Sequence, residues 1–526
     1  MVGARSEPSL VPVTIDFAVN GAPVSVPDDG ASLLEALRDR LGIRSPKDGC
    51  SPQGQCGCCT VLVDGAPRVS CVTPVRRVRD RSVVTLEGLE PGEREEWAEA
   101  FCATGASQCG FCTPGIIVRF SGLRAKSPDA GPAEVERALQ AHFCRCTGWQ
   151  TIVEAYAQYG TVPEGRDLEA ASRRATIEGR SAQAVGPDIS EGRGGFADDT
   201  APQDALVAVL DGQGGWVVAE TITEARLAAG KVQGRRTTID EVAPIDPPAG
   251  DWYRTLATGW VEPAYLELDA SWAGPGVEPA DPLANGGAFG AKTDSPVTSI
   301  ARRLADEHGR AVRVLYSRED SVRLGPKRPP FAAGIRADGT GVLRLARTAG
   351  AVERIARHLP GFQVEEVDVV GPPTSVDARA FGWGEAAILR AAMGGGPGWV
   401  VSPDGARAQV DIDDGVVSVK VRCGEVLDAV VLRSYCIGAV HMALGWAGSE
   451  VLTVDAQGMI HDLTVRSFGA LRAAEMPEVN IEIEPGKGAA VNGSDAVFAA
   501  TAAAAWAFQG FPARWPAPLM MRSTAP

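Results

Sequence analysis

The sequence has few histidines and fewer positive than negative charges, and each shortage excludes a class of function. Only five histidines occur among 526 residues: His142, His308, His358, His441 and His461. They share no spacing typical of metal ligands, so we interpret each as structural. Lys and Arg number 51 against 66 Asp and Glu, a formal charge of −15. This balance argues against nucleic acid as a partner, because a phosphate backbone attracts a basic surface.

Membrane and nucleotide signals are missing as well. No apolar run reaches the length of a membrane span, and the N-terminus lacks a secretory signal pattern, so we expect a cytoplasmic protein with no membrane span. Neither a Gly-x-Gly-x-x-Gly after a strand nor a P-loop is present, so we expect no flavin-binding segment. The composition, 45% hydrophobic and 22% charged residues, is that of a globular protein, and the length indicates several domains.

Twelve cysteines stand out against this background. We do not expect disulfides, because the cytosol keeps thiols reduced. One group of four lies in two close pairs that are separated by a helical stretch and can converge on one sulfur cage. Its members are Cys109, Cys112, Cys144 and Cys146. The pattern predicts a metal site, and taken alone it also fits a four-cysteine zinc site.

A second group of four has close to the plant-type [2Fe-2S] spacing. Its members are Cys50, Cys56, Cys59 and Cys71. Five residues separate Cys50 from Cys56, one more than is usual, which we interpret as a lengthened loop. Two unlike four-thiol groups in one short region indicate an electron relay. We interpret the remaining cysteines as core residues: Cys58, Cys102, Cys423 and Cys436.

Together these motifs resemble the iron-sulfur subunit of the xanthine oxidase family of molybdenum hydroxylases. The matching stretches are Lys47 to Cys50, Gly54 to Gly57, Thr60 to Gly65, Ser70-Cys71, Gln108 to Gly115 and Cys144 to Gly148. The resemblance implies two [2Fe-2S] clusters, the second of them close to a molybdopterin. In that family the Gln before the first Cys and the last Cys lie near the pterin ring, and here these residues are Gln108 and Cys146. The family usually has a small residue at the position of Cys58.

Periodicity and resemblance predict an α+β chain of four parts. Alternating apolar residues, an Asn20-Gly21 turn and a capping box at Ser32 predict a β-grasp ferredoxin-like domain over residues 1–88. Helical patterns predict a small four-helix [2Fe-2S] domain over residues 89–165. Residues 166–205 are charged and Gly-rich without sustained periodicity, which predicts a linker. Strands and Ala-rich helices alternate over residues 206–526, the part we call the module.

The module resembles pieces of the molybdopterin-binding subunit of the same family, although it is less than half as long. The matching stretches are Trp260 to Glu267, Gly286 to Lys292, Arg310 to Arg313, Ser317 to Glu319, Arg466 to Gly469 and Pro477. By this resemblance Gly287, Phe289 and Gly290 are cofactor-binding residues. We therefore expect a shortened, mixed α+β version of that subunit.

The catalytic base of the family is not evident in the module. Hydroxylation there needs a carboxylate, usually the Glu of a Gly-x-Gly-Glu turn near the C-terminus. The corresponding Gly493-Ser494-Asp495 lacks the second glycine, and its carboxylate is one methylene shorter. Glu385, in Gly382-Trp383-Gly384-Glu385, precedes the matching strands. Both are weak candidates for which capping or a surface turn is the alternative, and we assign no catalytic residue.

We therefore predict an electron-transfer subunit of a molybdenum hydroxylase, carrying two [2Fe-2S] clusters. It would pass electrons from a molybdopterin centre to a flavin or another acceptor on another subunit. The expected partners are a molybdopterin-binding subunit, which would hold most of that cofactor, and an FAD-binding subunit. Two alternatives stay open: a compact single-chain hydroxylase that binds its own molybdopterin, and a zinc-stapled scaffold. The substrate is not specified by the sequence.

Overall fold

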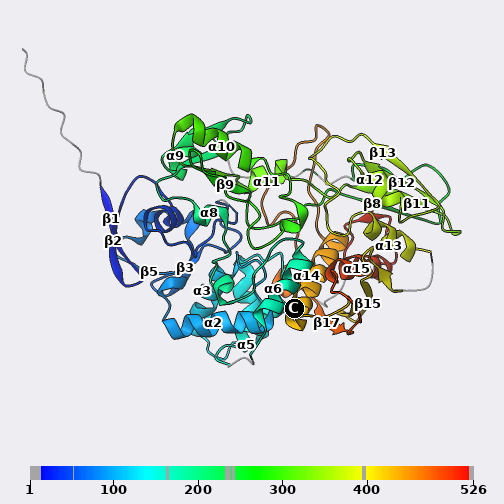
Figure 1. The fold of residues 1–526 in the computed structure, drawn as a ribbon, viewed down its shortest axis with the longest axis horizontal. Coiled ribbons are helices and arrows are strands. Elements are labelled where there is room, and N and C mark those ends of the chain that lie inside the picture. The colour runs from blue at the N-terminus through cyan, green and yellow to red at the C-terminus, as the bar shows by residue number, and fades with distance from the viewer. Residues whose placement is uncertain are drawn as a thin grey trace, which may run out of the picture.

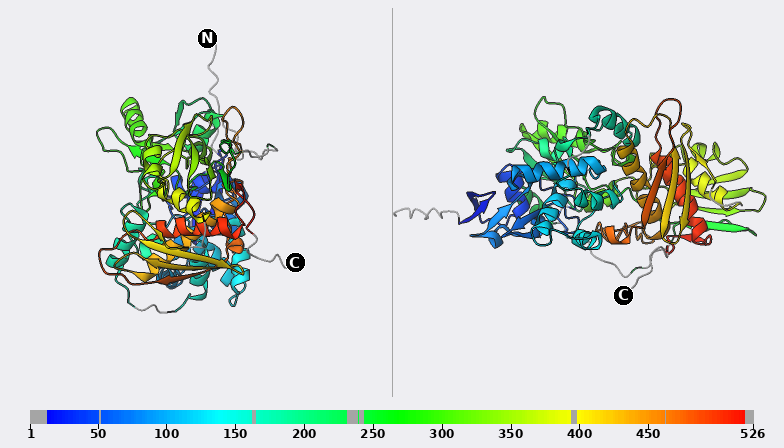
Figure 2. Two further views of the ribbon diagram at one scale, coloured as in Figure 1. Left: turned by 90° about the vertical axis from the view of Figure 1, so that its right-hand side faces the viewer. Right: turned by 90° about the horizontal axis from the view of Figure 1, so that it is seen from below.

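The chain forms an elongated molecule with the ferredoxin-like strands at one end and the later sheets at the other (Figures 1 and 2). The computed structural model describes residues 13–50, 52–161, 165–230, 239, 243–393, 398–461 and 463–519. Residues 1–12 of the predicted ferredoxin-like domain lie outside the described residues.

A five-stranded mixed sheet in the order β2-β1-β5-β3-β4 forms the first part. Its strands are β1 (Thr14–Val19), β2 (Ala22–Pro27), β3 (Thr60–Val63), β4 (Ala66–Val69) and β5 (Ser82–Val84). Strands β1 and β5 pair in parallel, and α1 (Leu33–Glu35) continues as the π-helical turn η1 (Ala36–Arg40). Ser32 caps this helix by accepting a hydrogen bond from Glu35 N at 3.2 Å. This is the predicted β-grasp arrangement.

Four helices form the second part, close to the predicted boundaries. They are α2 (Pro91–Thr104), α3 (Thr113–Arg124), α4 (Pro132–Ala138) and α5 (Gln150–Ala157). Proline stands in the first turn of α2, α3 and α4, where its missing N–H costs nothing. The buried rings of Trp97, Phe120 and Tyr156 pack together with centroids 5.1–5.8 Å apart and fix the bundle.

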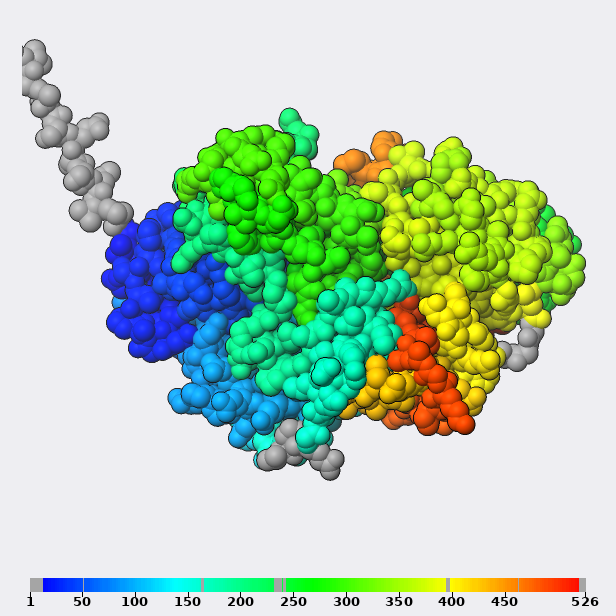
Figure 3. All heavy atoms as spheres, viewed as in Figure 1, coloured from blue at the N-terminus to red at the C-terminus, as the bar shows by residue number. Residues whose placement is uncertain are grey.

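The predicted linker is wrong, because residues 166–205 are folded into the molecule. They contain α6 (Leu168–Gly179), α7 (Pro187–Ser190) and α8 (Ala197–Thr200). In Figure 3 this segment lies across the centre of the visible face, between the N-terminal and C-terminal parts. Arg174 on α6 is fully buried, with an ion pair to Glu178 and a 2.6 Å bond to the carbonyl of Val491. Contacts with distant residues, which a local pattern does not reveal, order the segment.

The described residues of the module form three sheets. The first, in the order β7-β6-β10-β9, comprises β6 (Leu206–Leu210), β7 (Trp216–Ala219), β9 (Ala270–Ala273) and β10 (Val312–Leu315), with α9 (Ile222–Ala229) and α10 (Val297–His308). The second, β13-β12-β11-β8-β18, comprises β8 (Arg254–Thr258), β11 (Phe331–Ile335), β12 (Gly341–Ala346), β13 (Phe362–Val367) and β18 (Arg514–Trp515). The third, β14-β15-β16-β17, comprises β14 (Val400–Val401), β15 (Arg407–Asp413), β16 (Val416–Arg422) and β17 (Glu478–Ile483). The remaining helices of the module are α11 (Arg318–Leu324), α12 (Ala351–Ala356), α13 (Trp383–Ala391), α14 (Ala429–Gly448) and α15 (Ser494–Phe508).

Helices α14 and α15 form the core of the module. Among the described residues, α14 is the one helix long and apolar enough to cross a membrane by length and composition, so our statement that no apolar run has that length needs correction. Its most apolar window is 83% buried inside the protein, against α15, α6 and the third sheet. Such burial is also expected of the central helix of a protein core.

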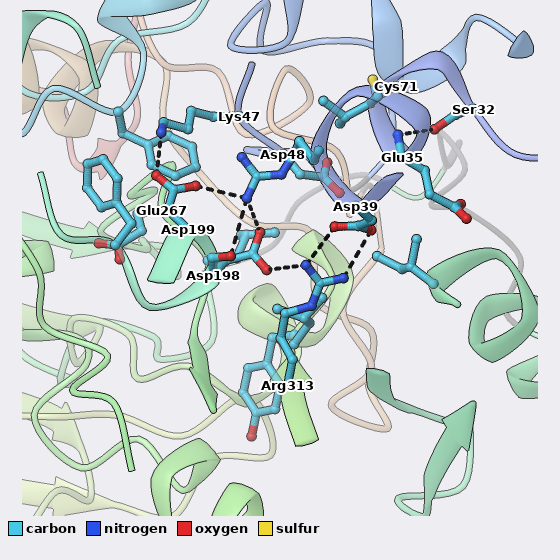
Figure 4. Close-up of a pocket in the computed structure, with 18 of the residues that line it drawn as sticks. Ser32, Glu35, Asp39, Lys47, Asp48, Cys71, Asp198, Asp199, Glu267 and Arg313 are labelled. Atoms are coloured by element: carbon cyan, nitrogen blue, oxygen red, sulfur yellow. Dashed lines mark hydrogen bonds and ion pairs between the residues drawn. The ribbon is translucent and has the colours of Figure 1, made fainter. Parts of the chain in front are cut away.

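Charged side chains join the ferredoxin-like domain to the rest of the chain (Figure 4). Arg38 Nη2 lies 2.7 Å from Asp198 and 2.9 Å from Asp199, both on α8. Lys47, which is buried, pairs with Asp199, and Arg313 on β10 lies 3.2 Å from Asp198. Burial alone would raise the pKa of Asp198, but Arg313 and Arg38 hold it at about 2. The two carboxylates therefore tie three parts of the chain together.

Candidate cluster sites and the adjoining cavity

The four thiols of the plant-type group lie together beside the first sheet, and all are buried. The Cys50 thiol is hydrogen-bonded to Cys56 and Cys71, and Cys71 is also hydrogen-bonded to Cys59. The backbone N–H groups of Gln55 and Cys71 donate to the sulfur atoms of Cys50 and Cys59, both at 3.5 Å. Converging thiols that accept backbone N–H bonds provide the surroundings that an iron-sulfur cluster needs.

The thiols of the other group lie in the loops before α3 and α5, and they form two pairs. The sulfur atoms of Cys109 and Cys146 are 3.7 Å apart. The Cys112 thiol donates to Cys144, which lowers the pKa of Cys144 to about 6 and raises that of Cys112 well above its ordinary value. Gly110 has a φ of 83°, and a Cβ there would stand 2.3 Å from the carbonyl oxygen of Ile189, so only glycine fits this turn.

This pairing bears on the choice between zinc and iron. A zinc site needs four ligand atoms around one ion. Among the described residues, no group of three or more His, Cys, Asp or Glu side chains is arranged to hold a single ion. Two pairs of thiols instead suit two irons that each take two ligands. Because a metal cation deprotonates coordinating thiols, the raised pKa of Cys112 is no obstacle to binding.

The two thiol sites are in direct backbone contact. Phe143 N donates to the carbonyl of Cys56 at 2.9 Å. A Cβ on Gly115 would stand 2.5 Å from the carbonyl oxygen of Gly57, so glycine lets α3 touch the first loop. His142, buried between them, has a pKa lowered to about 3 by burial, which fits its predicted structural role. Electrons therefore need to cross only a short, packed layer between the sites.

A cavity adjoins the second thiol site, and all five predicted cofactor-binding residues line it: Gln108, Cys146, Gly287, Phe289 and Gly290. The Gln108 side chain donates to the Cys146 carbonyl at 3.0 Å and to Ser434 Oγ on α14 at 2.9 Å. The opposite wall comes from the short 3-10 turn η6 (Ala288–Gly290). A Cβ on Gly287 or Gly290 would collide with backbone carbonyls at 2.4 Å and 2.3 Å, so this wall requires glycine.

Asp495 also lines the cavity, but its carboxylate is already paired. Arg379 Nε lies 2.8 Å from one oxygen, and Arg180 pairs with the other. Burial would raise the pKa of Asp495, yet Arg180 and Arg379 lower it below its ordinary value, which makes it a poor proton acceptor. Glu385 is buried outside the cavity lining, pairs with Arg328 and accepts from Gly382 N at the start of α13. The contacts of Asp495 and of Glu385 therefore fit a structural role better than a catalytic one.

Changing Asp495 to Asn is therefore expected to affect stability more than catalysis. The substitution leaves the guanidinium of Arg379 without its carboxylate partner, and the Arg379 side chain is only 8% exposed. The free energy of unfolding should therefore fall by about 1–3 kcal/mol. Turnover of the assembled enzyme should stay within about twofold of wild type, because the paired carboxylate does not act as the base. Parallel denaturation and steady-state assays test this. An unchanged unfolding curve with a collapse of kcat would identify Asp495 as the base.

Sequence reasoning missed several residues that line the cavity. Arg180, Arg379, Glu178 and Tyr435 lie far apart in the sequence and carry no spacing signal. Glu267 lies within a stretch that resembles the family, but the stretch does not indicate its role. Burial raises the pKa of Glu267 to about 7, although Lys292, 3.1 Å away, opposes the shift.

The N-terminal part matches two family models and several curated proteins. A 2Fe-2S iron-sulfur cluster binding domain matches residues 17–82, and a [2Fe-2S] binding domain matches residues 85–157. The nicotinate dehydrogenase small FeS subunit of Eubacterium barkeri is 38% identical over 142 residues, which are 27% of this chain and 90% of that protein. The xanthine dehydrogenase iron-sulfur-binding subunit of Escherichia coli O157:H7 is 41% identical over 148 residues, with the same coverage of 27% and 90%.

The chain belongs to the xanthine oxidase family of molybdenum hydroxylases. The predicted resemblance is confirmed, and the chain is an oxidoreductase of this family with two [2Fe-2S] binding domains and an electron-transfer function. Its fold is that of the aldehyde oxidoreductase from Desulfovibrio desulfuricans ATCC 27774, with a TM-score of 0.68 over 93% of this chain and 97% of that chain at 15% identity. At this identity the likeness shows the fold alone.

Residues 1–165 of the molybdenum hydroxylase component are expected to fold and to hold both clusters when expressed alone. The two thiol sites and their supporting helices lie within this part, and the small subunits that it matches are separate chains of similar extent. Iron analysis and visible spectra of the fragment test this. An insoluble or iron-free fragment would show that the module is needed to cover the second site.

Proposed function

We propose that this chain carries electrons from a molybdopterin centre in the cavity, through the second and then the first cluster, to an acceptor on another subunit. One observation carries the proposal: the five residues predicted to contact the pterin line a single cavity whose wall includes the second group of thiols. When bound there, the molybdopterin would supply the oxidation of substrate that releases the electrons. The twelve free thiols fit a reducing compartment, and we propose a cytoplasmic location.

The lining of the cavity fits a flat heterocycle with a phosphate tail. Phe289 and the backbone of Gly286–Gly290 offer a partly apolar wall, and Gln108 fixes the Cys146 loop behind it. Arg180 supplies a guanidinium whose side chain is 47% exposed, and such a group suits a phosphate. These residues would hold the cofactor at the second cluster.

The module restricts where a partner subunit can bind. A Cβ on Gly438 of α14 would stand 1.8 Å from the carbonyl oxygen of Cys146, and one on Gly148 would stand 2.7 Å from that of Ile437. The module thus covers the face of the second cluster site that borders the cavity. We propose that a molybdopterin-binding partner docks on the outer surface of the module.

We propose that the electron acceptor binds near the first cluster, beside Cys71. Val72, the next residue, is 51% exposed, and exposed arginines follow it in a chain of net charge −15. These arginines are Arg76, Arg77 and Arg79, and Arg68 precedes it on β4. An apolar contact point among positive charges suits an acidic redox partner, such as an FAD-binding subunit with an acidic docking face.

Reversing the charge of Arg76 and Arg77 is expected to slow electron delivery to an acidic acceptor. Dithionite-reduced chain should reduce an acidic flavodoxin about tenfold more slowly at low salt when both arginines are changed to Glu, because steering is lost. Stopped-flow mixing at several salt concentrations measures this. The matched control is Arg354→Glu on α12 with Arg357→Glu at the C-cap of the same helix, which lies at the opposite end of the molecule (Figure 1). Equal slowing by both double variants would refute a local docking face.

A second candidate function, the compact hydroxylase, is favoured by one observation: this chain alone builds both walls of the cavity. The pairing of Asp495 argues against it. Molybdenum analysis and a hydroxylation assay on the chain purified without partners separate the two functions. Clusters without molybdenum support the electron-transfer subunit, whereas molybdenum with turnover supports the compact hydroxylase.

A further inference from the structure

The first cluster site contains five buried thiols, one more than a [2Fe-2S] cluster takes. The additional thiol belongs to Cys58, which is fully buried and stands where the family usually has a small residue. The Cys58 thiol donates a hydrogen bond to the carbonyl oxygen of Cys56 at 3.8 Å. The sulfur atoms of Cys56 and Cys58 also lie equally far, 3.2 Å, from the place that a Cβ on Gly49 would occupy.

We propose that Cys58 is a reserve ligand of the first cluster, able to replace Cys56 on its iron. This proposal rests on the proposed function only in requiring that the first site hold a cluster. With a cluster bound, Cys58 Sγ would take the place of Cys56 Sγ as the thiolate ligand, so one iron–sulfur bond would be lost and one gained. The proton of the Cys58 thiol passes to the released Cys56 thiolate, so the step is neutral and needs no oxidant or reductant.

The surroundings of Cys58 allow its side chain to move while its backbone is held. Lys47 N donates to the Cys58 carbonyl at 3.1 Å, and α3 packs on the same peptide at Gly115. A rotation about χ1 is then the motion available to the thiol, since three staggered positions exist for it. The backbone of Cys56 is held as well, because Phe143 N donates to its carbonyl at 2.9 Å, so the Cys56 thiol also moves by rotation about χ1.

Cys58 also faces the second site. A Cβ on Gly115, in the first turn of α3 after Cys112, would stand 2.8 Å from the Cys58 carbonyl oxygen. A cluster ligated through Cys58 would therefore gain a ligand on the side that faces the second cluster. Exchange would keep the electron relay intact after the loss or oxidation of Cys56.

Substituting Cys56 by alanine tests the proposal. We expect Cys56→Ala to retain both [2Fe-2S] centres, with about four irons and two electron paramagnetic resonance signals, the first slightly shifted. Cys56→Ala combined with Cys58→Ala should lose the first centre and keep the second. The matched control is Cys109→Ala, whose sulfur lies 3.7 Å from that of Cys146 in the second site, and it should lose the second centre. Loss of the first centre in Cys56→Ala, with the second retained, would overturn the proposal.

Cys56→Ser provides a second test of ligand exchange if the alanine variant does not fold. A serine preserves the size of the side chain and leaves an oxygen donor in place. An absorption spectrum of all-sulfur ligation would mean that Cys58 has replaced residue 56, whereas a blue-shifted, oxygen-ligated spectrum would mean that it has not. Wild-type chain without any cluster would instead refute the proposed function.

Discussion

Changing Cys112 to alanine is expected to remove one of the two [2Fe-2S] centres and to halve the iron content, from about four to about two per chain. The Cys112 thiol is paired with Cys144, so its loss leaves one iron of the second cluster with a single protein ligand. The first site has its own thiols and backbone donors, and its centre should persist with an unchanged signal. Iron analysis and low-temperature electron paramagnetic resonance measure both effects.

The same variant should also interrupt electron flow from the cavity. Cys112 lines the cavity wall, and the second cluster stands between that cavity and the first site. Cys102→Ala is the control, because this half-buried thiol at the end of α2 contacts Ser190 and belongs to neither group of four thiols. Full iron content in Cys112→Ala would show that Cys112 is not a ligand.

Changing Glu450 to glutamine is expected to destabilise the chain strongly, by about 3–5 kcal/mol. Arg145 lies between two cluster thiols and donates both of its terminal nitrogens to Glu450, and these side chains are 2% and 0% exposed. Burial raises the pKa of Glu450, although Arg145 opposes the shift, so the intact pair adds little net stability. The cost of the substitution arises because the guanidinium is left buried without a counter-charge.

Denaturant titrations followed at the visible absorption of the clusters test this prediction. Glu278→Gln is a matched control, since Glu278 also pairs with an arginine, at 2.9 Å, but is 94% exposed. This control should change stability by less than about 1 kcal/mol. Equal effects of the two substitutions would contradict the view that Arg145 ties the second cluster loop to the module.

Sequence reasoning predicted those features that depend on local spacing. The cysteine intervals placed the two thiol sites, and the helical patterns predicted the four helices of the second domain. The Gly286–Gly290 stretch located one wall of the cavity because its glycines are required by close backbone contacts. All these signals lie within a few residues of one another.

Features that depend on distant partners could not be predicted in this way. The supposed linker is ordered because Asp198 and Asp199 form ion pairs with Arg38 and Lys47, which lie about 150 residues earlier. Contacts that close a loop of this length leave no pattern in the local sequence. The pairing of Asp495 with Arg180 and Arg379 likewise decides its role, and neither arginine is near it in sequence. Ion pairs between residues far apart in the sequence therefore determine the order of residues 166–205 and the role of Asp495, which the motifs did not specify.

The metal content of the anaerobically purified full chain tests the central claim most directly. Two [2Fe-2S] centres should give a reddish-brown protein with about four irons and two distinguishable electron paramagnetic resonance signals after reduction. Stoichiometric zinc in a colourless, iron-free protein would contradict the account, because neither thiol site could then carry electrons.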